Sequence, residues 1–148
     1  MTPQGVRLGA PERQPSELCY RRGNVPFELK LAPGENLARI RGWGKDDFQS
    51  TLAAMRDMAN DPRLQPGLGV LMDARELDYL ATPPEVSNFA APDAMPAFFA
   101  KHRLAIVVRR GAQFGVARVF AAKAEAAGAA VEVFVEEAVA LAWLRRSG

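Results

Sequence analysis

Two short apolar runs near the end of the chain frame its most regular pattern. Residues 104–108 (LAIVV) and 131–135 (VEVFV) are almost entirely apolar, and apolar residues recur at helical spacing over residues 114–124 between them. Continuous apolar runs of this length are typical of strands covered on both faces. Gly128 stands where a helix-ending glycine is expected. The pattern predicts a strand, a helix and a second, parallel strand.

Upstream, apolar and polar residues alternate instead. Residues 27–31 (FELKL) and 37–41 (LARIR) each alternate with period two, and the turn residues 33–36 (PGEN) separate them. This pattern predicts an antiparallel hairpin with one face in water. A continuous apolar run over residues 68–72 then predicts another covered strand, and it places Asp73 at the strand's carboxyl end, where ligands commonly bind in open α/β sheets.

Caps and helical spacing predict further helices. Gly44 is the expected N-cap of a helix that ends near Asn60. Residues 82–85 (TPPE) form a capping box with proline at the first helical position, so a second helix begins there. A last helix is expected over residues 136–145. Its predicted inner face consists of Val139, Ala142 and Trp143.

Strands and helices alternate after the hairpin, which predicts parallel units with right-handed crossovers. The expected fold is α/β, with an about five-stranded, mostly parallel sheet, an N-terminal antiparallel hairpin and a right-handed βα superhelix. Residues 1–24 show no period and contain several prolines, so we expect a flexible or surface-draped tail. Residues 25–148 are expected to form a single domain.

The composition of the chain argues against several classes of function. The chain has 148 residues, and its 19 basic and 17 acidic side chains give a net charge of +2, which is too small an imbalance to indicate a nucleic-acid partner. With Cys19 and His102 as its single cysteine and histidine, it offers no zinc ligand set. No apolar run is long enough to span a membrane, and no secretory signal opens the chain, so a cytoplasmic location is expected.

A glycine-led turn after the strand at 104–108 is a candidate anion site. Arg109, Arg110 and Gly111 precede the next helix, whose N-terminal amides are suited to an anion. A solvated turn is the simpler interpretation. The glycine spacing of a dinucleotide-binding loop is absent, and His102 has no identifiable acid partner or nucleophile. We therefore expect no cofactor and no catalytic constellation.

Scattered residues along the chain together suggest a family. They are Gly42 ahead of Asp47 and Phe48, Asp73 after an apolar run, RLAIVV at 103–108, Phe120, Val133 with Phe134, and ALAWL at 140–144. On these residues, the chain from about residue 27 to residue 144 resembles the SpoIIAA-like, STAS/SEC14-type small domains. The resemblance implies a right-handed βα superhelix, which is the winding that the strand and helix pattern also predicts.

The resemblance also implies a role for Thr82. Anti-anti-sigma relatives carry a serine that accepts phosphate at a helix N-terminus, after a strand that ends in Asp. Asp73 and Thr82 stand at similar spacing, so Thr82 is the phosphoacceptor equivalent, although Ala81, Pro83 and Pro84 replace the surrounding motif. The capping box also accounts for Thr82. We favour the N-cap interpretation and keep the phosphoacceptor as its alternative.

Two functional hypotheses follow. The first is a non-catalytic STAS-like regulatory domain that acts by association with a protein partner or with itself. The second is a carrier of a small apolar or lipid-like ligand, in a pocket near the helices of residues 82–100 lined by Phe89, Met95, Phe98 and Phe99. An apolar pocket would favour the carrier, whereas a solid core with an exposed apolar patch would favour the interaction domain.

Overall fold

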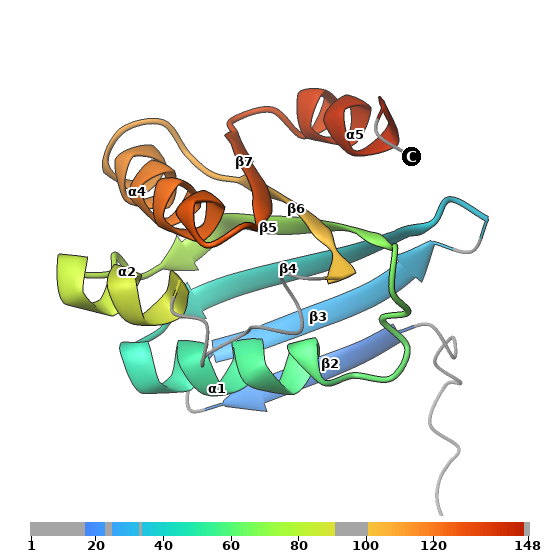
Figure 1. Ribbon diagram of the computed structural model, residues 1–148. Coiled ribbons are helices and arrows are strands. Elements are labelled where there is room, and N and C mark those ends of the chain that lie inside the picture. The colour runs from blue at the N-terminus through green and yellow to red at the C-terminus, as the bar shows by residue number, and fades with distance from the viewer. Residues whose placement is uncertain (1–16, 23–24, 33, 91–100, 147–148) are drawn as a thin grey trace, which may run out of the picture.

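The computed structural model describes residues 17–22, 25–32, 34–90 and 101–146, and these form one sheet with helices on both faces (Figure 1). The six strands follow one another across the sheet in the order β2-β3-β4-β5-β6-β7. They are β2 (Glu17–Arg22), β3 (Val25–Ala32), β4 (Leu37–Lys45), β5 (Gly69–Asp78), β6 (Arg103–Val107) and β7 (Ala130–Phe134). The helices of the described residues are α1 (Phe48–Ala59), α2 (Pro83–Ala90), α4 (Ala112–Ala126) and α5 (Glu137–Arg146).

The predicted α/β fold is confirmed. Strand β3 pairs with β4 in the expected antiparallel hairpin, and β4, β5, β6 and β7 are parallel. One difference lies in the segment expected to be a surface-draped tail, because Glu17–Arg22 forms β2 and pairs antiparallel with β3. This pairing explains why the sheet has six strands instead of about five. Residues 1–16 lie outside the described part of the chain.

The helices divide unequally between the two faces of the sheet. Figure 1 shows α1, α2 and α4 on one face and α5 on the other. The first face carries the larger core, which includes Phe27, Ile40, Val70, Leu104, Phe120 and Val131. The α5 face carries a smaller cluster, made of Leu37, Leu71, Ala105, Val107, Ala140 and Leu144. Alternate residues of the same strands therefore build two separate cores.

Strands β4 and β5 continue together beyond the point where β5 stops pairing with β6. Asp73 pairs with Arg41 on one side and with Val107 on the other, and it lies in mid-strand because β5 continues to Asp78. The predicted position of Asp73 at the strand end was therefore wrong. The register shifts between Arg41 and Trp43. At Gly42 a Cβ atom would lie 2.6 Å from Cε1 of Phe27, so only glycine fits beneath that ring.

Two helix predictions also need correction. The N-cap of α1 is Asp47, whose carboxylate accepts a hydrogen bond from the Ser50 amide, whereas Gly44 belongs to the extended β4. In α5 the inner residues are Ala140 and Leu144, and Val139 is 49% exposed.

The packing of Leu144 explains which side of α5 faces the sheet. The Leu144 side chain lies over Gly69, where a Cβ atom would approach it to 3.3 Å. Trp143 is half-buried beside this contact and stacks under the Arg103 guanidinium, 3.8 Å from the ring centroid. Placing the smaller leucine against the sheet allows the closer approach of helix and strand, and the indole covers the edge.

Candidate functional site

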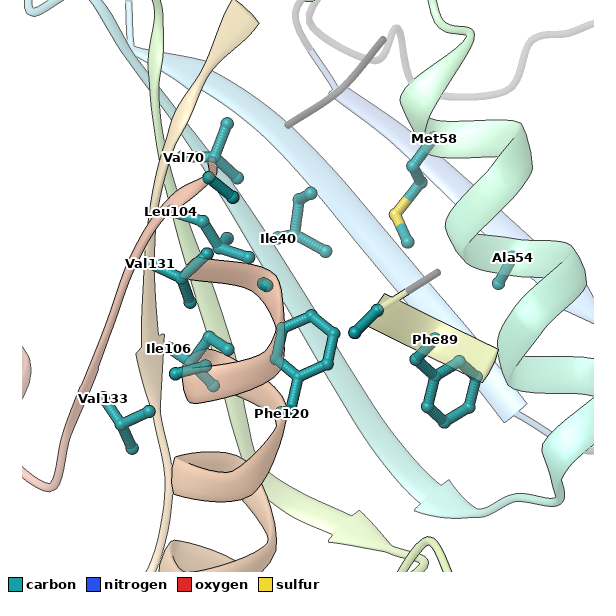
Figure 2. Close-up of a cluster of buried hydrophobic side chains, with 14 of the residues drawn as sticks. Ile40, Ala54, Met58, Val70, Phe89, Leu104, Ile106, Phe120, Val131 and Val133 are labelled. Carbon is teal, nitrogen blue, oxygen red and sulfur yellow. The ribbon is translucent and has the colours of Figure 1, made fainter. Parts of the chain in front are cut away.

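An apolar cavity of about 190 Å³ lies between the sheet and the three helices of the larger face. Figure 2 shows Phe89 of α2 and Phe120 of α4 near Ile40 of the sheet, with Met58 coming from α1. Other side chains that line the cavity include Phe27, Met55, Met72, Leu77, Tyr79, Leu80, Ile106, Gln113 and Ala117. None of the described residues in this lining is charged.

The cavity reaches the surface beside the loop that joins β5 to α2. Leu80 lines the cavity and is also 50% exposed. A side chain in contact with both the cavity and solvent marks the boundary between them, so the entrance lies at this loop. The neighbouring lining residue Tyr79 is half-buried.

Tyr79 is fixed by a hydrogen-bonded group at this entrance. Its hydroxyl donates to Oε1 of Glu85 at 2.8 Å, and the Thr82 amide donates to the same oxygen at 3.0 Å. The Glu85 amide in turn donates to the Thr82 hydroxyl at 3.4 Å, which completes the capping box of α2. The Tyr79 ring meets Phe89 edge-on at 6.5 Å, and Phe89 also lies 5.2 Å from the Phe48 ring.

This arrangement shifts the pKa values of both ionisable groups. The hydrogen bond from the Thr82 amide, together with that from Tyr79, holds the pKa of Glu85 below its ordinary value. Burial, together with the bond to the Glu85 carboxylate, raises the pKa of Tyr79. The phenol therefore stays neutral and the carboxylate stays charged over the physiological range. Neither is set up to exchange a proton with a bound molecule.

The other two polar side chains of the lining are also engaged. Thr51 donates a hydrogen bond to the carboxylate of Asp46, and burial raises the pKa of that carboxyl group. Gln113 accepts from the Arg109 amide at 2.6 Å and donates to the Ala74 carbonyl at 2.7 Å. Both partners are protein groups, so these side chains do not rely on a ligand for their hydrogen bonds.

The four predicted pocket residues are only partly covered by the structure. Phe89 lines the cavity, as predicted, whereas Met95, Phe98 and Phe99 lie outside the described residues. The sequence missed Tyr79 and Gln113. A weak signal was present for each: Tyr79 comes just before the capping box, and Gln113 is a polar residue one position after the start of an alanine-rich helix.

The predicted anion site stays a prediction. Gly111 is the N-cap of α4, with a φ of 92° that favours glycine. The Arg109 guanidinium is directed toward β5, where it donates to the Arg75 carbonyl, and Arg110 is exposed. His102, the single histidine, is buried and has Nδ1 2.9 Å from the Leu68 carbonyl oxygen. Arg109 and His102 therefore each contact a backbone carbonyl group in or next to β5.

A charged network occupies the other face of the sheet. Glu137, at the start of α5, forms ion pairs with Arg39 of β4 and Arg75 of β5. Arg75 also binds Asp73 through two hydrogen bonds of 2.9 and 2.8 Å. Burial would raise the pKa of Asp73, but the bonds from Arg75 outweigh it and keep the pKa below its ordinary value. No local sequence pattern predicted this pairing, because Arg39 and Glu137 are 98 positions apart in the chain.

Comparison with known proteins identifies the fold. No protein-family model and no curated protein matches the chain. The chain is similar to the crystal structure of an uncharacterised DUF3478-family protein from Shewanella loihica PV-4, described as having a SpoIIAA-like fold. The match covers 84% of this chain and 96% of that one, with 18% sequence identity and a TM-score of 0.51.

The fold is SpoIIAA-like. This confirms the fold that the residues suggested. None of the helices in the described ranges is both long and apolar enough to cross a membrane. Within the same ranges, no group of three or more His, Cys, Asp and Glu side chains could hold a metal ion.

Proposed function

We propose that this chain is a non-catalytic SpoIIAA-like domain that binds a small apolar ligand in the cavity between the sheet and α1, α2 and α4. The observation that carries the proposal is the cavity itself, with its volume of about 190 Å³ and its uncharged lining. Ligand sites are typically concave and mostly apolar. The polar side chains in this lining are held by other protein groups, which leaves an apolar surface for the ligand.

The lining of the cavity supports a binding role. The cavity is open beside Leu80, and the polar side chains of its described lining already hydrogen-bond with other protein groups. Water in such a space gains little hydrogen bonding. An apolar ligand that displaces it gains free energy by burying apolar surface.

A matched pair of variants tests the proposal. Ala117 of α4 lines the cavity, whereas Ala122 on the same helix is exposed. Ala117→Leu should fill part of the cavity, raise the Tm of the free protein and weaken ligand binding. Ala122→Leu adds the same atoms to the same helix in solvent, so it should leave both properties unchanged.

Thermal unfolding and titration calorimetry measure both effects. The wild-type protein is titrated with toluene, naphthalene, 1-octanol and decanoate. A ligand at about 100 times its Kd should raise the Tm by roughly 8 °C, since it adds about 2.7 kcal/mol. The Ala117→Leu variant should lose this rise and Ala122→Leu should keep it. The proposal is wrong if no probe binds the wild type, or if the two variants respond alike.

Association with a protein partner, the other hypothesis from the sequence, has weaker support. An interaction surface would be expected to gather exposed apolar side chains. Among the described residues, the large exposed ones are Leu80, Val119 and Val139, which belong to a loop, α4 and α5. Self-association stays a prediction that native mass spectrometry over a range of concentrations can check. A dimer that forms independently of added ligand would restore this hypothesis.

A further inference from the structure

We infer that the ligand is an uncharged aromatic molecule of one or two rings, and that it contains no long acyl chain. This inference rests on the proposed function, because it specifies what the same cavity binds. Three properties of the lining carry it: the size of the cavity, the state of its polar groups and the kinds of side chain that face it.

The volume of the cavity limits the size of the ligand. The cavity measures about 190 Å³. An engineered cavity of about 150 Å³ in another protein stays dry and binds benzene. The present cavity is therefore somewhat larger than one that accommodates a single benzene ring. It has space for a substituted benzene or two fused rings, whereas most of a membrane lipid or a long fatty acid would lie outside it.

The polar groups of the lining indicate that the ligand is uncharged. The lining contains no charged residue among those described, and Tyr79, Thr51 and Gln113 already hydrogen-bond with Glu85, Asp46 and the Ala74 carbonyl. A carboxylate or ammonium group in the cavity would lose its water and meet no opposite charge among the described lining residues, which is strongly unfavourable. A hydroxyl group would meet the same difficulty to a smaller degree. The ligand should therefore be hydrocarbon-like where it is enclosed.

The side chains of the lining favour an aromatic ligand over an aliphatic one of equal size. Aromatic rings face the cavity from four elements: Phe27 from β3, Tyr79 from the loop after β5, Phe89 from α2 and Phe120 from α4. Rings at such varied positions offer edges and faces for tilted aromatic contacts, which add to the energy of burial.

The methionine side chains of the lining also favour an aromatic ligand. Met55 and Met58 reach the cavity from α1, and Met72 reaches it from β5. Thioether sulfur makes favourable contacts with aromatic rings, and the flexible side chain adapts to the shape of its neighbour. Three of the five methionines of the chain face this one space. Leucine would fill the same volume without favouring aromatic ligands.

A series of probes that differ in one property at a time tests the inference. Toluene and methylcyclohexane compare an aromatic with an aliphatic ring. Toluene, naphthalene and phenanthrene compare sizes, benzoate adds a charge, and decanoate supplies an acyl chain. We expect toluene and naphthalene to bind, methylcyclohexane to bind roughly 2- to 12-fold more weakly than toluene, and phenanthrene, benzoate and decanoate to show no saturable binding by calorimetry. Met55→Leu should weaken toluene binding and leave methylcyclohexane unchanged.

The outcomes separate this inference from the proposed function. Tighter binding of decanoate than of toluene, lost in Ala117→Leu, would overturn the aromatic ligand and keep the apolar-ligand role. Equal affinities for methylcyclohexane and toluene would likewise overturn the inference alone. If no member of the series binds the wild-type protein, the inference and the proposed function both fail.

Discussion

The two faces of strand β5 use alternate residues of one short segment in opposite ways. Val70, Met72 and Ala74 belong to the larger apolar face, and the last two line the cavity or pack beside its core. Leu71 joins the small core under α5, and Asp73 lies in the ion-pair network with Arg75 and Glu137. One face is apolar and incompletely filled, whereas the other joins a small apolar cluster to paired charges.

Because the two faces differ in polarity, they also differ in what can fill an empty space on each of them. A hollow between charged side chains can hold water, because water finds hydrogen-bond partners there. The polar hollow beside Arg39, Asp73 and Glu137 is of this kind. A void lined by Phe120, Met58 and their neighbours offers water no such partners. Of these two hollows, only the one on the apolar face is therefore suited to an apolar ligand.

The largest expected effect comes from truncating one core residue on each face. Phe120 is 9% exposed and Leu144 is 8% exposed, so they are matched in burial. Phe120→Ala should cost about 3–5 kcal/mol and Leu144→Ala about 2–5 kcal/mol, measured by chemical denaturation. Saturating naphthalene should restore part of the loss in Phe120→Ala, because it can occupy the enlarged cavity. Equal restoration in Leu144→Ala would break the distinction between the faces.

The next effect concerns close packing at two glycines. A methyl group at Gly42 would meet the Phe27 ring at 2.6 Å on the cavity face, whereas one at Gly69 would meet Leu144 at 3.3 Å on the α5 face. Gly42→Ala should therefore destabilise the protein by about 1–3 kcal/mol, and Gly69→Ala by less. Gly42→Ala should also alter toluene affinity, because Phe27 lines the cavity. A larger loss from Gly69→Ala would contradict this order.

A smaller effect is expected at the cap beside the cavity entrance. Thr82→Ala removes the acceptor for the Glu85 amide and should cost about 1 kcal/mol. Thr82→Ser keeps the hydroxyl and serves as the control, with thermal unfolding as the measurement. A Thr82→Ala variant of unchanged stability but altered partner binding would instead favour the phosphoacceptor alternative.

The smallest effect, on the α5 face, depends on pH. Arg75→Met should cost about 0.2–1 kcal/mol near neutral pH, since the Arg75 side chain is 39% exposed. The pKa of Asp73 is lowered in the folded state, so the pair stabilises the protein above the ordinary carboxyl pKa. That stabilisation is lost as the pH falls through the lowered value. Wild type and Arg75→Met should therefore converge in acid, as followed by urea denaturation.

A second arginine provides the control for that measurement. Arg145 pairs with Glu35 at 3.8 Å, and both side chains are more than half exposed. Arg145→Met should change stability less than Arg75→Met, with no convergence in acid attributable to Asp73. An equal loss at every pH would show that the network on the α5 face does not depend on the ionised Asp73.

Most of the fold was predictable because burial leaves a local pattern. The continuous run at 104–108 and the alternation at 37–41 identified β6 and β4. Strand β2 was missed because Glu17–Arg22 has little regular alternation, and its structure depends on pairing with β3. The α5 face was predicted one residue out of phase, since the decisive contact joins Leu144 to Gly69, far away in the sequence.

The candidate site was less predictable for a similar reason. Phe89 was found because it belongs to the apolar stripe of a well-capped helix. Met58 and Phe120 look the same in sequence whether they fill a core or face a cavity. The difference depends on how far α1 and α4 lie from the sheet, and no short stretch of sequence encodes that distance. Tyr79 and Gln113 acquire their roles only through partners in the folded chain.

Strand β5 extends past the end of its pairing with β6, and residues of this extension line the cavity. Strand β6 stops pairing with β5 at Asp73, while β5 continues to Asp78 with β4 alone. Beyond Asp73, the edge of β5 that faces away from β4 has carbonyl groups that a neighbouring strand would normally bind. Gln113 and Arg109 instead donate to the Ala74 and Arg75 carbonyls. Arg109, in the turn before α4, and Gln113, in its first turn, thus supply the donors that a further strand would have supplied.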